Sequence, residues 1–250
     1  MKKSTSSYLE TMLYLDYSRE DRPWITREHT LRMLIGILGM ALPLLLYVFL
    51  LIASGQAKPL HSISHYYFTR VAGIFVVILG LLALFLIVYK GKKPMDFIIS
   101  TAAGLFALCV IFFPTGNISD ICLDPDKKYS VTILQASNPR ETFHYVSAAI
   151  FLLCLAFMSF FLFTKSNKSP GKRGPRKILR NRIYRTCGVF IVVPILVILF
   201  GSFDFIVREE WLENYQLTFW METVAVESFG VAWLIKGEAL FRDRPMPLKS

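Results

Sequence analysis

The stretch that decides the fold runs from Met33 to Ala53 and reads MLIGILGMALPLLLYVFLLIA, with no charged side chain. As a helix it would be about 30 Å long, which matches the thickness of the hydrocarbon core of a bilayer. It follows the mostly polar residues 1–32 and is not followed by a small-residue cleavage site. We therefore interpret it as a retained membrane span rather than a signal peptide.

Five further apolar blocks of similar length follow the first one. The chain has 250 residues, of which 54% are hydrophobic and only 18% are charged. A chain of this size has too few remaining residues to surround six apolar helices with polar structure. The pattern therefore predicts an all-α, polytopic membrane bundle with six transmembrane helices in one domain, 33–235. The predicted spans are residues 33–53, 71–89, 97–113, 145–163, 187–203 and 219–235.

Basic residues are distributed unevenly among the segments that connect these blocks. The formal net charge is +10, and 22 of the 28 Lys and Arg residues lie in residues 1–32, 90–93, 165–185 and 236–250. Such segments stay in the cytoplasm, so both termini are predicted to be cytoplasmic. Residues 1–32 would then form a cytoplasmic segment, either a short interfacial helix or a disordered tail, and residues 236–250 a cytoplasmic tail.

The same distribution indicates the expected partners. The basic loop 165–185 is placed to contact anionic lipid headgroups, at about 1 kcal/mol for each charge near the surface. Because the positive charge follows the alternation of the spans, it is explained by membrane orientation, and no nucleic-acid partner is expected.

A carboxylate lies deep within the last apolar block, FWMETVAVESFGVAWLIKGE at 219–238. Glu227 is about 12 Å inside the predicted boundary, near the membrane midplane. Pro43 and Pro194 fall at similar depth, and broken helices beside a midplane charge are typical of transporter sites. Glu227 would carry a proton or anchor a ligand; the alternative is a protonated carboxyl group bonded to a neighbouring helix.

Histidines gather at the predicted outer rim of the bundle. His61 and His65 lie four residues apart in HSISHYYFTR at 61–70, and His144 begins the fourth block at the same membrane level. With Glu222 they could form a zinc site. The alternative is an aromatic belt at the headgroups. No cofactor is predicted otherwise.

Five stretches, taken together, resemble a family of uncharacterised bacterial multi-pass inner-membrane proteins. They are LRMLIGILGMALPLLL, ISHYYFTRVAGIFVVILGLLALFLIVYKG, TAAGLFALCVIFFPT, FHYVSAAIFLLCLAFMSFFLFTK and ETVAVESFGVAWLIKGE. The resemblance implies a bacterial cytoplasmic membrane and no assigned activity. The positions that resemble the family's signature are His65, Tyr66, Tyr67, His144, Tyr145, Glu222, Phe229, Gly230, Trp233, Lys236 and Gly237.

Three functional hypotheses follow. The first is a protein that binds or transports a small or lipid-like ligand in an outward-facing polar pocket. The second is a zinc-dependent membrane hydrolase whose ligands are His61, His65 and His144. The third is a non-catalytic assembly or scaffold protein that acts through its basic cytoplasmic loop. For the first, the pocket residues are Glu227, Glu222, Arg70, His65, His144 and Tyr66, with an ion pair between Arg70 and Glu222.

Overall fold

The structure is a computed structural model that describes residues 28–91, 93–118, 130–166, 174–202 and 214–239. The predicted interfacial helix of the N-terminal segment, the middle of the basic loop and most of the C-terminal tail lie outside the described residues. Within the described ranges the protein is helical and contains no strand.

Each predicted apolar block coincides with a helix, which confirms the all-α fold. Four helical stretches are long and apolar enough to cross a membrane: His29–Ser54, Pro94–Phe112, Asn138–Leu162 and Pro175–Gly201. The helices are α2 (Glu28–Ser54), η2 (Ile63–Phe68), α3 (Ala72–Val88), α4 (Pro94–Phe112), α5 (Asn138–Phe157) with its continuation η3 (Met158–Leu162), α6 (Pro175–Ser202) and α8 (Leu217–Lys236).

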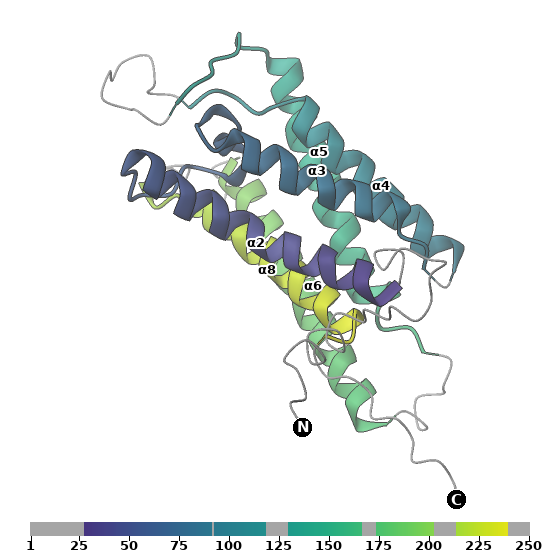
Figure 1. Cartoon of the computed structure of the whole chain (residues 1–250). Coiled ribbons are helices and arrows are strands. Elements are labelled where there is room, and N and C mark those ends of the chain that lie inside the picture. The colour runs from purple at the N-terminus through teal and green to yellow at the C-terminus, as the bar shows by residue number, and fades with distance from the viewer. Residues whose placement is uncertain (1–27, 92, 119–129, 167–173, 203–213, 240–250) are drawn as a thin grey trace, which may run out of the picture.

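The long helices lie alongside one another in one bundle (Figure 1), and their contacts form a ring in chain order. Each packs against the helix before and after it, and α8 closes the ring by packing against both α6 and α2. Successive helices run in opposite directions, as shown where the end of α3 meets the start of α4: Ser100 donates to the Tyr89 carbonyl oxygen at 3.3 Å. We call the end with η2 and the start of α5 the η2 end. The opposite end, with the starts of α2, α4 and α6, is the basic end.

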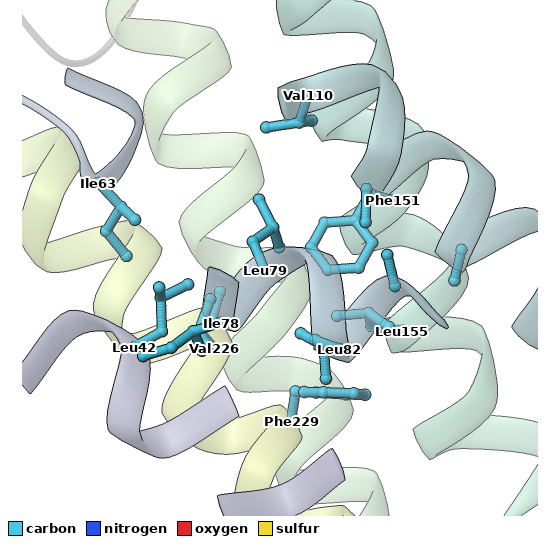
Figure 2. Packing of buried hydrophobic residues seen from close by; sticks show 14 of the residues in the cluster. Leu42, Ile63, Ile78, Leu79, Leu82, Val110, Phe151, Leu155, Val226 and Phe229 are labelled. Atoms are coloured by element: carbon cyan, nitrogen blue, oxygen red, sulfur yellow. The ribbon is translucent and has the colours of Figure 1, made fainter. Parts of the chain in front are cut away.

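The inside of the ring is filled by apolar side chains rather than by polar ones. Figure 2 shows Leu79 and Leu82 of α3 near Phe151 of α5, with Phe229 of α8 below them. The outside of the helices is also apolar, and Ile52 of α2 is 74% exposed. Helices that are apolar on every side are a property of membrane proteins, because lipid covers their outer surface.

Two glycines allow α2 and α8 to approach closely. A Cβ atom added at Gly36 would lie 2.9 Å from the Gly230 carbonyl oxygen, and one added at Gly230 would lie 2.8 Å from the Gly36 carbonyl oxygen. Gly104 of α4 is similarly close to α3, with Ile87 Cγ1 2.7 Å from an added Cβ atom. Small residues at such crossings let helix backbones meet, which is how membrane helices associate.

The two predicted helix-interior prolines are both inside continuous helices. Pro43 lies in α2 and Pro194 in α6, and both are buried. Each ring removes a backbone N–H that would otherwise bond the carbonyl four residues earlier. The helices continue through both positions, so the chain has no broken helix there.

Candidate functional site

Polar side chains from three distant segments meet at the η2 end. Their common centre is the short helix η2, which follows a serine cap: Ser62 Oγ accepts a hydrogen bond from the His65 backbone N–H at 3.3 Å. Tyr66 and Phe68 of η2 are fully buried and anchor it in the core. The loop before α5 also holds η2, because the Val131 N–H donates to the Phe68 carbonyl oxygen at 2.9 Å.

His144 links α4, α5 and η2 through both of its ring nitrogens. It is 97% buried, since only 3% of its surface is exposed. Nδ1 lies 2.8 Å from the Phe113 carbonyl oxygen, and Nε2 lies 3.0 Å from Ser64 Oγ. A carbonyl oxygen only accepts, so Nδ1 carries a proton, and in the neutral imidazole Nε2 accepts the Ser64 hydroxyl proton.

Glu222 connects α8 to the same short helix. The Ile63 backbone N–H donates to Glu222 Oε2 at 2.6 Å, although the two residues are far apart in the sequence. The N···O distance of 2.6 Å is short for a hydrogen bond from a backbone N–H. This bond therefore holds the carboxyl group beside η2.

His65 lies on the same short helix and is neutral at physiological pH. Burial lowers the pKa of His65 to about 4, with further contributions from His61 and His144. Its Nδ1 lies 2.7 Å from Ser62 Oγ, and its ring centroid is 6.0 Å from that of His61. A neutral imidazole can form hydrogen bonds without adding a positive charge to this group of residues.

Tyr66 is a fully buried member of this group of residues. Its ring packs against Phe219 of α8, with the centroids 5.9 Å apart. Burial raises the pKa of the Tyr66 phenol to about 12, so the phenol keeps its proton. The hydroxyl lies near the Leu60 backbone but makes no hydrogen bond of ordinary geometry to any described residue.

The structure therefore brings together four of the predicted site residues, which we call the η2 cluster. His65 and Tyr66 lie on η2, His144 lies on α5 and Glu222 lies on α8.

The expected ion pair between Arg70 and Glu222 is wrong. Arg70 is exposed, and no ion pair joins these two described residues. Arg70 precedes α3, which begins at Ala72, so it lies in the turn after η2 and not inside a helix. The Ile63 N–H takes the place predicted for the guanidinium.

Glu227 is also separate from the η2 cluster. It is half-buried and lies on the less buried side of α8, together with Trp220 and Leu234, each seven residues away. The shared face of these three residues is as predicted. The structure does not place Glu227 beside Glu222, because five residues correspond to about 140° around a helix.

The predicted zinc ligands are only partly brought together. His61 and His65 are neighbours, and His144 lies close enough to act on His65. Both His144 nitrogens are already hydrogen-bonded. Within the part of the chain that the structure describes, no three His, Cys, Asp or Glu side chains are arranged to hold a metal ion.

Sequence reasoning missed Ser62, Ser64 and two backbone groups of this site. The serines alternate with the histidines in HSISH, a pattern that could have suggested hydrogen bonding between them. The Phe113 carbonyl and the Ile63 N–H have no signal in the sequence. Phe113 caps the end of α4, where helix carbonyls lack partners within the helix.

Comparisons of the chain with protein-family models, with curated proteins and with solved structures found no match.

Proposed function

We propose that the chain is a six-span protein of a bacterial cytoplasmic membrane that binds a small ligand at the η2 cluster. In this proposal both termini are cytoplasmic and the cluster faces outward. The distribution of Lys and Arg supports this orientation, because Arg176 and Lys177 at the start of α6 and Lys236 at the end of α8 lie at the end opposite the cluster.

The chemistry of the η2 cluster favours a ligand with a positive charge or several hydrogen-bond donors. Glu222 supplies a carboxyl group, which an ammonium would bind in its ionised form, and His65 supplies an imidazole whose pKa burial lowers to about 4. Arg70, the cation that follows η2 in the sequence, is exposed and forms no ion pair with Glu222. The observation that carries the proposal is the 2.6 Å hydrogen bond from the Ile63 N–H, which fixes the Glu222 carboxyl group at η2, the short helix that also carries His65. An ammonium group is the simplest ligand of this kind.

The test is thermal unfolding of the purified full chain in a neutral detergent, with a series of primary ammonium chlorides. Sodium chloride at equal ionic strength is the reference. A ligand at 100 times its Kd stabilises by about 2.7 kcal/mol. We expect an amine to raise the unfolding temperature of the wild type but not of Glu222→Gln, in which the amide oxygen still accepts the Ile63 N–H.

Glu227→Gln is the matched control for binding, because it removes a carboxylate from the same helix outside the cluster. It should respond to amines as the wild type does. If no amine stabilises the wild type, or if Glu222→Gln responds equally, the proposed ligand site is refuted.

If the protein transports this ligand, the half-buried Glu227 carries the charge across, and Glu227→Gln loses uptake into vesicles but keeps binding.

A zinc-dependent hydrolase is the second candidate, favoured by the 6.0 Å separation of the His61 and His65 rings. It requires His144 to give up a hydrogen bond. Elemental analysis distinguishes it: about one zinc per chain, lost in His65→Ala, supports a metal site. Metal-free protein rejects it. A scaffold role predicts instead that neutralising Lys172, Arg173, Arg176 and Lys177 impairs function while the outer histidines are dispensable.

A further inference from the structure

One narrow face of α8 points away from the core of the bundle. Its residues recur at alternating intervals of four and three positions, and the first of them, Trp220, is 50% exposed. The other four members are half-buried. Phe229, which is fully buried, lies about 160° around the helix from Glu227. We call this face the outer stripe of α8, and it consists of Trp220, Val224, Glu227, Val231 and Leu234.

The intervals of the outer stripe are those of a seam between two helices. A repeat of four and three residues keeps one stripe facing a neighbouring helix in a left-handed pair. Most membrane helices pack with this geometry. The close contact of α8 with α2 is made at Gly230, which is not a member of the stripe. The outer stripe therefore suits a helix that is not part of this ring.

Glu227 lies at the centre of the outer stripe without a polar partner. It forms no hydrogen bond or ion pair with any described residue. It is ten residues from Leu217, where α8 begins, which corresponds to about 15 Å and to the middle of the helix. Ionisable side chains in membrane helices almost always face the bundle interior or pair with another group. Glu227 faces outward, so its partner has to come from outside the ring.

The neighbouring helices do not offer such a partner on their outer surfaces. Leu44 of α2 and Val193 of α6 are both exposed and apolar, and each lies next to the proline inside its helix. A carboxyl group among apolar side chains requires a hydrogen-bond donor at the same membrane depth.

A second copy of the chain provides this donor. A protonated carboxyl group carries one donor and also accepts, so two such groups can satisfy each other. All copies have one orientation in a membrane, so two α8 helices related by a two-fold axis along the membrane normal run parallel and bring identical residues together. Glu227 is the middle residue of the stripe, so its two copies meet where the helices cross. Val224 and Val231 then pack on either side of them.

We propose that the chain forms a homodimer through the outer stripe of α8, in which the two Glu227 carboxyl groups are hydrogen-bonded to each other. A single polar residue in an apolar seam fixes the register of the two helices. The inference rests on the proposed membrane span of α8 but not on the ligand site, because Glu222 lies on a different face of the helix. Amine binding and dimer formation are therefore lost independently.

The first test is disulfide cross-linking of the full chain in liposomes, with the four native cysteines replaced by serine. Single cysteines replace Val224 or Val231 of the outer stripe. Leu105→Cys is the matched control, because Leu105 is 51% exposed on α4, across the ring from α8. We expect both stripe variants to form disulfide-linked dimers and Leu105→Cys to remain monomeric.

Two results of this experiment would overturn the proposal. They are equal cross-linking of all three variants and no cross-linking of the stripe variants, in which case lipid or another membrane protein covers the stripe. A membrane-impermeant maleimide checks the span separately, since Val231→Cys should not react with it. A reaction would show that α8 does not span the membrane, and the six-span proposal would fail together with the dimer.

The second test measures the bond between the two carboxyl groups. Energy transfer between copies labelled at Lys58→Cys gives the protein-to-lipid ratio at which half of the dimers dissociate. Glu227→Leu removes the bond and leaves the stripe apolar, so we expect this ratio to rise about tenfold. Glu227→Gln keeps a donor and an acceptor and should stay within about twofold of the wild type.

Equal dimerisation of the wild type and Glu227→Leu would overturn the proposed bond, and so would a loss in Glu227→Gln as large as that in Glu227→Leu. Circular dichroism establishes that each variant is folded, which we expect because the outer stripe lies outside the core. The cross-linking test retains Glu227 and therefore does not depend on the folding of these variants.

Discussion

His65 couples the stability of the η2 cluster to pH. Its pKa is about 4 in the folded protein and about 6.5 in an unfolded chain. Between these values the unfolded state binds more protons, so the free energy of unfolding increases with pH. This contribution is fully present above pH 6.5 and is lost as the pH falls toward 4.

We therefore expect wild-type protein to unfold at progressively lower temperature as the pH is lowered from about 6.5 to 4. His65→Gln should reduce this dependence, because it removes the group that must take up a proton. Unfolding temperatures in detergent across this pH range measure the effect. Tyr67→Phe, a change on the same short helix, should keep the wild-type slope. An unchanged slope in His65→Gln would contradict the environment assigned to His65.

Ser64 should stabilise the fold through its single bond to His144. Ser64→Ala leaves the buried Nε2 atom of His144 without a donor, which costs about 1–3 kcal/mol. Ser54→Ala is the control, because Ser54 Oγ bonds only to Leu50 of its own helix, at 2.7 Å. Chemical unfolding in detergent compares the two. Equal effects of both variants would show that the Ser64–His144 bond does not contribute.

At the scale of helices, the close crossing of α2 and α8 depends on glycine. Gly230→Ala would place a methyl group 2.8 Å from the Gly36 carbonyl oxygen, so α2 and α8 must separate. Overpacking of this kind costs about 1–3 kcal/mol. Gly73→Ala on α3 meets nothing within 4 Å and should be neutral or slightly stabilising. Thermal unfolding of the two variants checks the prediction, and equal stability would contradict it.

The positions of the helices were largely predictable, because uncharged blocks of bilayer length leave few alternatives. Their boundaries were less so. The fifth helix was predicted from residue 187, but α6 begins at Pro175 and includes a basic stretch. Hydropathy detects the part of a helix inside lipid and not its polar extension. Pro175 at the first position of the helix is the signal that was overlooked.

The candidate site was predicted in part. His65, His144 and Glu222 were assigned to one membrane level, and all three are linked to η2. His65 lies on η2, His144 bonds to Ser64, and Glu222 accepts from the Ile63 N–H. Whether the Arg70 side chain lies inside the bundle or in solvent could not be predicted, because it depends on the residues at which η2 ends and α3 begins. The bonds to the Phe113 carbonyl and the Ile63 N–H depend on backbone positions that no residue type reveals.

At the scale of the molecule, the ring separates two polar ends by an apolar core. The η2 end carries the η2 cluster with Glu222, and the basic end carries Arg32, Lys177 and Lys236. Large apolar residues cover the outside of the helices between them, including Leu44 and Leu105. The proposed function requires these two ends to lie on opposite sides of one membrane.

The measurement that tests this central claim most directly is cysteine labelling with a membrane-impermeant maleimide. Single cysteines replace Lys58, beside the η2 end, and Gly174, at the start of α6, in a chain whose four native cysteines are serine. We predict that Lys58→Cys reacts in intact cells and that Gly174→Cys reacts only in inverted membrane vesicles. Labelling of both positions from the same side would contradict the opposed ends, and with them the account of the whole molecule.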